Sequence, residues 1–538
     1  MRFGRQEILG HLLMAIFFLS ICHNIGFAQP KPFPDKNQTT DKKLAEIIDA
    51  LSSQNLVHAK TLVQKVLFAQ PRNVTAQTLA GIVAERENEL SEAEKHFALA
   101  AKFAPQSPET RNNYGAILVR LNRTTEAARE FAASLKVNPN HRSALVNLAN
   151  IRFAENNLAV ARELFDKARS AAPDVEILRA LLLISLQLGE KERAAEEFKE
   201  YFEFRKNLSV SLADTRLGET LLAKKMFAEA RQELEFILAN DAKNVDALVL
   251  LSRVYMQQKD FSAAGQILED ATARGISDGK VYDALSEVYQ AGGFVEKAIP
   301  AMRLAIEKEP NNEAYRLHYG LLLIDTKAPT AAVIRIEEAI KDFPASPRLR
   351  LLLGMALFDL QKFNEAQTAF QRALELEPQF VPALAYLAVM HADQGRLKEA
   401  IGFYERAIKS DGKSAILRYL LADTILKLQE PDNRKVEDEL KQVILLEPNL
   451  ALAYSTLGRL YMRQKRFDEA VVNLERAVEI DSNLPDALYQ LGLVYARLKR
   501  NGESKIVLAK FKELNESKIK QKEVDRLELV RRLANVRF

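Results

Sequence analysis

Apolar and small residues return at a step of about 34 residues along most of the chain. Within each step, two stretches carry apolar side chains at the i, i+3 and i+4 spacing of one helix face. In residues 451–484, Leu457 and Tyr461 share the first such face. Leu474 and Ala477 share the second, after a polar turn. Each step therefore predicts two helices joined by a tight turn.

A small residue in the second stretch marks the register of the repeat. Most of its steps are 34 residues, one is 33 and two are 36, and the residues are Ala59, Ala93, Ala127, Ala161, Ala194, Ala230, Ala264, Ala298, Ala332, Ala366, Ala400, Val436, Ala470 and Ser504. A fixed step of this size predicts an all-α array in which each helix pair covers the apolar face of the next. We predict fourteen units within 40–518, namely 40–73, 74–107, 108–141, 142–174, 175–210, 211–244, 245–278, 279–312, 313–346, 347–380, 381–414, 415–450, 451–484 and 485–518.

Two further positions repeat in the same register. The eighth position of the unit is small in twelve of fourteen units: Gly81, Gly115, Ala149, Gly218, Ser252, Ser286, Gly320, Gly354, Ala388, Ala422, Gly458 and Gly492. Small residues there let the paired helices approach closely. Proline ends the second helix at or near position 32 in eight units: Pro71, Pro105, Pro139, Pro173, Pro310, Pro344, Pro378 and Pro448.

With these positions the chain resembles the tetratricopeptide repeat (TPR) family over about nine-tenths of its length. The resemblance implies an α-solenoid of about fourteen TPR helix-turn-helix repeats, wound as a right-handed superhelix. It also implies protein partners bound on a concave wall lined by the first helices, and no cofactor. The family's frequent tryptophan is missing, because the chain contains no Trp.

Three places depart from the repeat pattern. The unit 175–210 has Leu182 at its eighth position and Lys206 where proline is usual, so a local bend is expected. Residues 430–435 lengthen one loop between helices, which we expect to protrude. Pro300 lies inside a second helix and is expected to kink it.

The N-terminal residues differ in composition from the repeats. Residues 1–28 have a basic start, a mostly apolar run and small residues before Gln29, which is typical of a cleaved signal peptide. An uncleaved membrane anchor and a lipoprotein signal at Cys22 are the alternatives, although the apolar run is short for a span. Residues 29–39 form a proline-rich polar linker.

The C-terminal residues 519–538 predict one amphipathic capping helix that covers the last repeat. Its polar face carries Arg526, Arg531, Arg532 and Arg537. The alternative is a basic amphipathic segment on an anionic membrane, but four acidic residues in and just before it weaken that interpretation: Glu516, Glu523, Asp525 and Glu528.

Composition and charge exclude several classes of function. The net charge of +4 over 538 residues is too small to indicate nucleic acid as a partner. The only cysteine, Cys22, falls in the predicted signal peptide, and the histidines lack paired metal-ligand spacing. No nucleophile motif or phosphate loop is present, so we predict no enzyme activity, no metal and no cofactor. No transmembrane span is predicted after signal cleavage.

Candidate binding residues lie at the thirteenth position of the predicted first helices. Successive units carry three acidic residues and then three basic ones: Asp325, Asp359 and Asp393, followed by Lys427, Arg463 and Arg497. Basic residues at a helix C-terminus are favoured by the helix dipole, which explains them without a ligand. Aspartate opposes the dipole, so three in register favour a binding role, with a partner carrying basic groups.

A second candidate group consists of asparagines near the start of the array. Asn113 and Asn147 occupy the sixth position of adjacent units, with Asn112 and Asn150 nearby. Amides can bond both the N–H and the C=O groups of an extended peptide. The pattern resembles the asparagine ladder of O-linked N-acetylglucosamine transferases, although it stops after two units. Ordinary polar residues on an exposed face are the alternative interpretation.

We therefore predict an exported, non-catalytic scaffold that binds protein or peptide segments, most simply in a bacterial periplasm or envelope. The alternative is a targeting or regulatory subunit of an envelope enzyme or a polysaccharide synthesis or export complex. A eukaryotic secretory protein is the third, since five Asn-x-Ser/Thr sequons are present: Asn37, Asn73, Asn122, Asn207 and Asn515.

Overall fold

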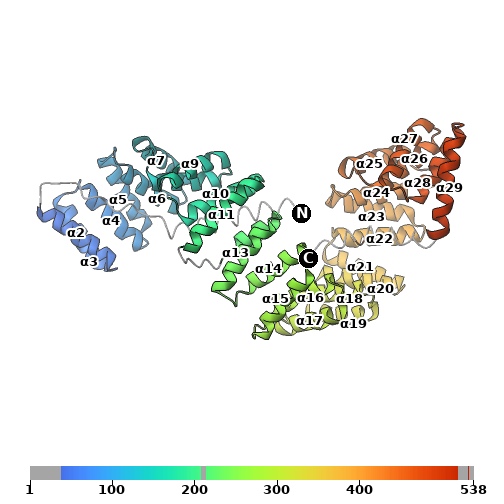
Figure 1. Cartoon of the computed structure of the whole chain (residues 1–538), viewed down its shortest axis with the longest axis horizontal. Coiled ribbons are helices and arrows are strands. Elements are labelled where there is room, and N and C mark those ends of the chain that lie inside the picture. The colour runs from blue at the N-terminus through green and yellow to red at the C-terminus, as the bar shows by residue number, and fades with distance from the viewer. Residues whose placement is uncertain (1–37, 208–213, 519–530, 532–538) are drawn as a thin grey trace. The chain divides into compact units, whose positions relative to one another are not determined.

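The computed structural model describes residues 38–207, 214–518 and Arg531. Over these residues the chain forms 28 α-helices, α2 to α29, and no strand (Figure 1). The all-α prediction and the pairing of helices are confirmed for this part of the chain. The chain divides into two structural units, Met1–Val254 and Tyr255–Phe538, which are described separately.

The first unit contains the helices from α2 to α14, and the unit boundary falls inside α14. Their bounds are α2 (Gln38–Ser52), α3 (Leu56–Ala69), α4 (Val74–Arg86), α5 (Leu90–Phe103), α6 (Pro108–Arg120), α7 (Thr124–Val137), α8 (Arg142–Ala154), α9 (Leu158–Ala171), α10 (Val175–Leu188), α11 (Lys191–Asn207), α12 (Arg216–Ala223), α13 (Phe227–Asn240) and α14 (Val245–Gln257).

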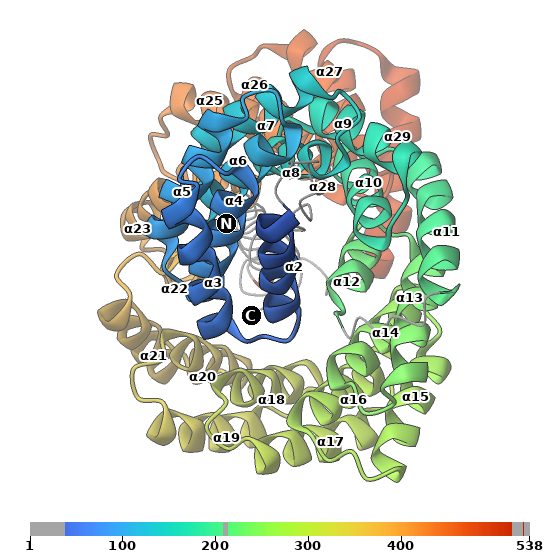
Figure 2. The ribbon, with the colours of Figure 1, turned by 90° about the vertical axis from the view of Figure 1, so that its left-hand side faces the viewer.

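The second unit contains α15 to α29. Their bounds are α15 (Phe261–Ala273), α16 (Gly279–Ala291), α17 (Val295–Lys308), α18 (Glu313–Asp325), α19 (Pro329–Asp342), α20 (Pro347–Asp359), α21 (Phe363–Leu376), α22 (Val381–Asp393), α23 (Leu397–Ser410), α24 (Ala415–Ile425), α25 (Asn433–Leu446), α26 (Ala451–Arg463), α27 (Phe467–Ile480), α28 (Pro485–Arg497) and α29 (Asn501–Lys518). Even-numbered helices are the first of each pair and form one layer, and odd-numbered helices form the other, as α16 to α21 show (Figure 2).

The turn within each pair has the same backbone conformation almost everywhere. The fifteenth residue of the repeat unit lies in this turn and has a positive φ in thirteen pairs: Gln54, Asn88, Asn122, Asn156, Gly189, Lys225, Lys259, Gly293, Lys327, Gln361, Gly395, Lys465 and Lys499. A single left-handed residue lets the second helix fold back antiparallel to the first. The exception is the pair α24–α25, where the extra residues 430–435 replace the tight turn with the segment 426–432.

Replacing Gly395 with valine tests this turn, because φ is +75° and a new Cβ would meet no atom within 4 Å. We expect a destabilisation of about 1–2 kcal/mol from the left-handed conformation alone. Chemical denaturation followed by far-UV circular dichroism measures it. An unchanged midpoint would show that the turn adopts another conformation in solution.

The marker residue of the second helix is buried in every pair. Thirteen of the fourteen marker residues, from Ala59 to Ala470, have 0% exposure, and Ser504 has 5%. Glycines of the first helix contact a large side chain of the second: a Cβ on Gly115 would lie 2.6 Å from the Phe131 ring. The predicted close approach of the paired helices therefore follows from glycine opposite an aromatic or leucine side chain.

The hydrophobic core of the second unit is continuous. One cluster of buried residues extends from Ala298 to Tyr495 and includes side chains from every helix pair between α17 and α28. Adjacent first helices such as α18 and α20 also contact each other directly. Each pair is thus covered by its neighbours, as a repeat array requires.

The irregular unit 175–210 contains a buried ion pair that the sequence pattern did not indicate. Arg205 on α11 pairs with Glu233 on α13, and each is 1% exposed. The Arg205 guanidinium also donates to the Tyr201 hydroxyl at 3.0 Å and lies 4.6 Å from the centre of the Phe236 ring. Burial raises the pKa of Glu233, and the charge of Arg205 opposes this. These polar contacts join α11 to α13 across residues 208–213.

A second ion cluster lies beside the same segment. Asp214 accepts from Arg179 at 2.6 Å and from Arg216 through both of its carboxylate oxygens. Burial opposes ionisation of Asp214, but the Arg216 hydrogen bonds and the Arg179 charge outweigh it and hold the pKa of Asp214 well below its usual range. The irregular unit thus adds paired charges to its buried apolar residues.

Several predictions concern residues that the structure does not describe. These are the signal peptide 1–28, nearly all of the linker 29–39 and, apart from Arg531, the capping helix 519–538.

Pro300 lies within α17, which continues on both sides of it. No helix in the described ranges combines the length and the apolar character that a bilayer span needs.

Candidate protein-binding surface

Three aspartates occupy the same place on three successive first helices of the second unit. Asp325, Asp359 and Asp393 are the last residues of α18, α20 and α22, and all three are exposed. We call them the acidic row. Because each lies at a helix C-terminus, its negative charge adds to that of the unpaired carbonyl groups there. The row is therefore a local concentration of negative potential that favours a cation.

A cation from a distant part of the chain lies at the middle of the acidic row. The Arg531 Nη2 donates to both carboxylate oxygens of Asp359, at 2.8 and 2.7 Å. The two residues are 172 positions apart in the sequence. The Arg531 and Asp359 side chains keep 38% and 27% of their surface exposed, so the ion pair is partly shielded from water. Asp325 accepts a hydrogen bond from Gln290 at 3.2 Å.

A buried tyrosine, Tyr386, lies close to this ion pair. It belongs to α22, is 3% exposed and stacks on Phe370 with ring centres 4.9 Å apart. Burial raises its pKa, and the negative charges of Asp359 and Asp325 add to this rise. The charge and a hydrogen bond of Arg531 act in the opposite direction. The tyrosine hydroxyl therefore lies within reach of the guanidinium.

The repeat core positions this tyrosine. Phe370 packs against Gly354 so closely that a Cβ there would lie 2.6 Å from Cδ1 of the ring. Phe370 in turn stacks on the Tyr386 ring. Thus Gly354, Phe370 and Tyr386 connect the helix crossing of one pair to the first-helix surface of the next. Sequence reasoning missed Tyr386, although its sixth position on the first helix could have indicated it.

The three basic residues of the next pairs have contacts within the repeats. Lys427 pairs with Asp423 at 2.7 Å, four residues earlier on the chain. Arg463, the last residue of α26, donates to the Leu426 carbonyl at 2.7 Å, just after α24 ends. Arg497 ends α28 and is exposed. Contacts of this kind stabilise helix ends and explain Lys427 and Arg463 without a ligand.

The asparagines bond chiefly to one another. Asn147 on α8 donates to Asn112 on α6 at 3.0 Å, and Asn112 lies 3.5 Å from the Asn113 amide oxygen. Asn112 and Asn113 are 0% and 1% exposed, whereas Asn147 and Asn150 are half-buried. The Asn113 amide nitrogen is buried with no hydrogen-bond acceptor. The amides thus join adjacent first helices, and a role in binding stays a prediction.

One cluster of potential metal ligands is brought together by neighbouring first helices. Asp283 and Glu287 on α16 and His318 on α18 place ligand atoms within 4.8 Å of one another. His318 Nδ1 lies 2.9 Å from Asp283 Oδ1, which satisfies both groups without an ion. No spacing pattern in the sequence indicated this cluster, because the histidine belongs to the next repeat.

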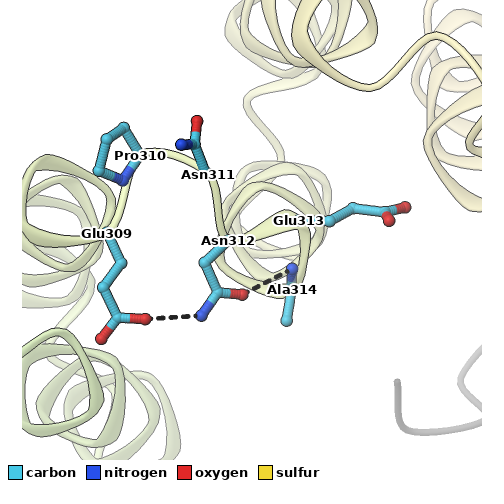
Figure 3. Close-up of a pocket in the computed structure, with 6 residues that line it drawn as sticks. All are labelled: Glu309, Pro310, Asn311, Asn312, Glu313 and Ala314. Carbon is cyan, nitrogen blue, oxygen red and sulfur yellow. Dashed lines mark hydrogen bonds between the residues drawn. The ribbon is translucent and has the colours of Figure 1, made fainter.

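The pocket between α17 and α18 is explained by a helix cap (Figure 3). Asn312 accepts from the Ala314 backbone N–H at 3.1 Å and donates to Glu309 at 3.0 Å. The polar groups that line this shallow pocket therefore start α18 and hold its turn. They bring together no pair of groups for catalysis.

Stacked helix pairs with a buried small residue at every crossing define a helical-repeat protein. Models of the tetratricopeptide repeat match residues 44–108, 115–176, 221–287, 351–415 and 485–518, and a TPR repeat model matches 458–499. These matches cover more than half of the chain. The chain belongs to the tetratricopeptide repeat family.

The relatives of known sequence are distant. The chain is 22% identical to BBSome complex member BBS4 of Bos taurus over 310 residues, which are 56% of this chain and 58% of that protein. It is 26% identical to protein O-mannosyl-transferase TMTC3 of Homo sapiens over 372 residues, which are 63% of this chain and 39% of that protein. The chain therefore spans less than two thirds of each relative.

Among solved structures, the APC/C hetero-tetramer Cut9–Hcn1 contains a similar chain. The TM-score is 0.37 and the identity 16%, over 85% of this chain and 96% of that one.

Proposed function

We propose that this protein is a non-catalytic scaffold that binds protein segments along the first-helix surface of its second unit. The partner segment carries basic side chains that pair with the acidic row. Charges placed this way set the orientation of a partner and the rate of its association more than the affinity. The observation that carries the proposal is Asp359 in contact with the guanidinium of a residue 172 positions away.

Two comparisons bear on this proposal. The matched repeat models support a protein-binding array, and the repeats fill the described part of the chain. The similarity to the transferase TMTC3 covers 39% of that protein. It supports a relationship between the repeats of the two proteins and gives no support for a catalytic centre in this chain.

Reversing the three charges of the acidic row tests the proposal. The triple change Asp325→Lys, Asp359→Lys and Asp393→Lys should reduce capture of basic partners about tenfold or more, because like charges then face each other. Crosslinking in the native host followed by quantitative mass spectrometry measures this. The helical circular dichroism should be unchanged, since all three residues are exposed.

A matched control reverses three carboxylates on the second helices instead. Glu337, Glu375 and Glu399 are exposed residues of α19, α21 and α23, so their change to lysine alters the net charge equally. Partner capture should survive it. Equal losses from both triple variants would contradict a specific role for the acidic row.

The targeting-subunit alternative and export are further proposals. An enzyme that copurifies with the full chain in fixed ratio would favour a regulatory subunit over an independent scaffold. Export is supported by the composition of residues 1–28 alone. The intact mass of native protein would show whether these residues are removed and whether any sequon carries a glycan.

A further inference from the structure

The acidic row and the basic residues of the following pairs differ in how their charges are satisfied. Lys427 and Arg463 find partners within their own or the adjacent first helix. Among the residues that the structure describes, the cation paired with Asp359 is Arg531, which lies beyond the last helix of the array. Aspartate at a helix C-terminus is unfavourable unless a cation accompanies it. The site at Asp359 is thus built for a positive group that the surrounding repeats do not provide.

The chemistry of the site fits arginine better than lysine. One guanidinium nitrogen donates to both oxygens of Asp359, and the same side chain reaches the Tyr386 hydroxyl. A guanidinium has five N–H donors in a fixed plane, so it can satisfy a carboxylate and a hydroxyl at once. The Tyr386 ring is fixed by its stacking on Phe370, so the geometry is set before a ligand arrives.

We propose that Asp359 and Tyr386 form an arginine-recognition site and that Arg531 of the same chain occupies it as an internal competitor. This inference rests on the proposed function, since it identifies arginine as the residue that an external segment presents there. A partner then binds by displacing Arg531. A site occupied in part by its own chain shows a reduced apparent affinity for an external ligand, in proportion to the fraction that is free.

The test uses the full chain and a fluorescent peptide of residues 519–538 as the probe. Fluorescence anisotropy gives the peptide affinity for wild type, Arg531→Ala, Asp359→Asn and the double variant. Arg531→Ala should bind the peptide about fivefold or more tightly than wild type, because the internal competitor is lost. In the Arg531→Ala background, Asp359→Asn should bind it about fivefold more weakly than its parent, the range for a part-exposed ion pair. With Arg531 present the loss should be smaller, because the change also weakens the internal competitor.

Peptide variants test the choice of arginine. A peptide with Arg531→Lys should bind the Arg531→Ala chain roughly threefold more weakly than the natural peptide, because the planar fork is lost. As a matched control on the protein, Arg372→Ala removes an arginine of α21 whose pair with Glu375 is mostly exposed. This variant should bind the peptide as wild type does.

Three results would overturn the proposal. Equal peptide affinity in wild type and Arg531→Ala would show that Arg531 does not compete. Full binding by Asp359→Asn in the Arg531→Ala background would place the peptide elsewhere. A wild-type dimer that dissociates on Arg531→Ala, measured by analytical ultracentrifugation, would make the contact one between two copies. If peptide binding fails while partner capture still depends on the acidic row, the scaffold function stands and only the internal competitor is excluded.

Discussion

Replacing Arg205 with leucine is expected to destabilise the first unit by about 3–5 kcal/mol at neutral pH. The change leaves the Glu233 carboxylate buried without its cation, and breaking a buried ion pair from one side costs this much. Both side chains are 1% exposed, so water cannot compensate. Because the chain contains no tryptophan, the measurement is chemical denaturation followed by far-UV circular dichroism. Hydrogen exchange of α11 and α13 locates the loss, since repeat arrays open locally.

The pH dependence of this variant has a definite sign. Burial raises the pKa of Glu233, and without Arg205 only the smaller effect of the Arg179 charge remains to offset that rise. When the pKa of a group is higher in the folded than in the unfolded protein, the folded state loses stability as pH rises through the folded pKa. The deficit of Arg205→Leu should therefore shrink as pH falls toward the unfolded pKa of glutamate. A deficit independent of pH would contradict a stranded carboxylate.

The double variant Arg205→Leu with Glu233→Leu is the matched control. It removes both charges together, so it should recover most of the stability lost in the single variant. An exposed pair such as Arg335 and Glu338 should contribute about 0–1 kcal/mol when either partner is changed. If Arg205→Leu loses no more unfolding free energy than a change in this exposed pair, the buried pair does not join α11 to α13.

Replacing Gly354 with leucine is expected to destabilise the second unit by about 1–3 kcal/mol through overpacking. A Cβ at this position would lie 2.6 Å from Cδ1 of Phe370, whose ring is 0% exposed and has no room to move away. Since Phe370 stacks on Tyr386, the same change should also weaken binding of the 519–538 peptide. Thermal denaturation and fluorescence anisotropy measure the two effects.

Gly402 supplies the control for Gly354. It lies in α23, and a Cβ there would meet no atom within 4 Å. Alanine at this position should stabilise the helix by about 0.5–1 kcal/mol, because it restricts the unfolded chain. Unchanged stability in Gly354→Leu would contradict the register that places position 8 at the helix crossing.

The two halves of the chain use their first-helix surfaces differently. In the first unit, Asn112 and Asn147 bond to each other across adjacent helices, so these amides contribute to the structure of the array. In the second unit, the acidic row has carboxylates at the surface and a guanidinium from outside the array in contact with one of them. The second unit therefore offers the better-defined surface for a partner.

The sequence by itself determined the helix pairs, their step and their register. Residue size at position 8 and at the marker position, the twentieth of each unit, determines contacts between helices that are close in the sequence. Such contacts recur in every repeat. Thirteen of the fourteen marker residues predicted from periodicity alone have 0% exposure. The insertion predicted at 430–435 was equally visible, because it shifts the register that follows it; the structure places the longer loop at 426–432.

Only the tertiary structure decided which polar groups meet. No spacing rule pairs Arg205 with Glu233, His318 with Asp283 or Arg531 with Asp359, because each pair joins different helices or segments whose side chains must first be placed. Sequence periodicity placed Asp325, Asp359 and Asp393 in one register, but not the cation beside them. Apolar packing follows a repeated pattern of sizes, whereas an ion pair depends on the position of single atoms, and that information appears only once the helices are packed.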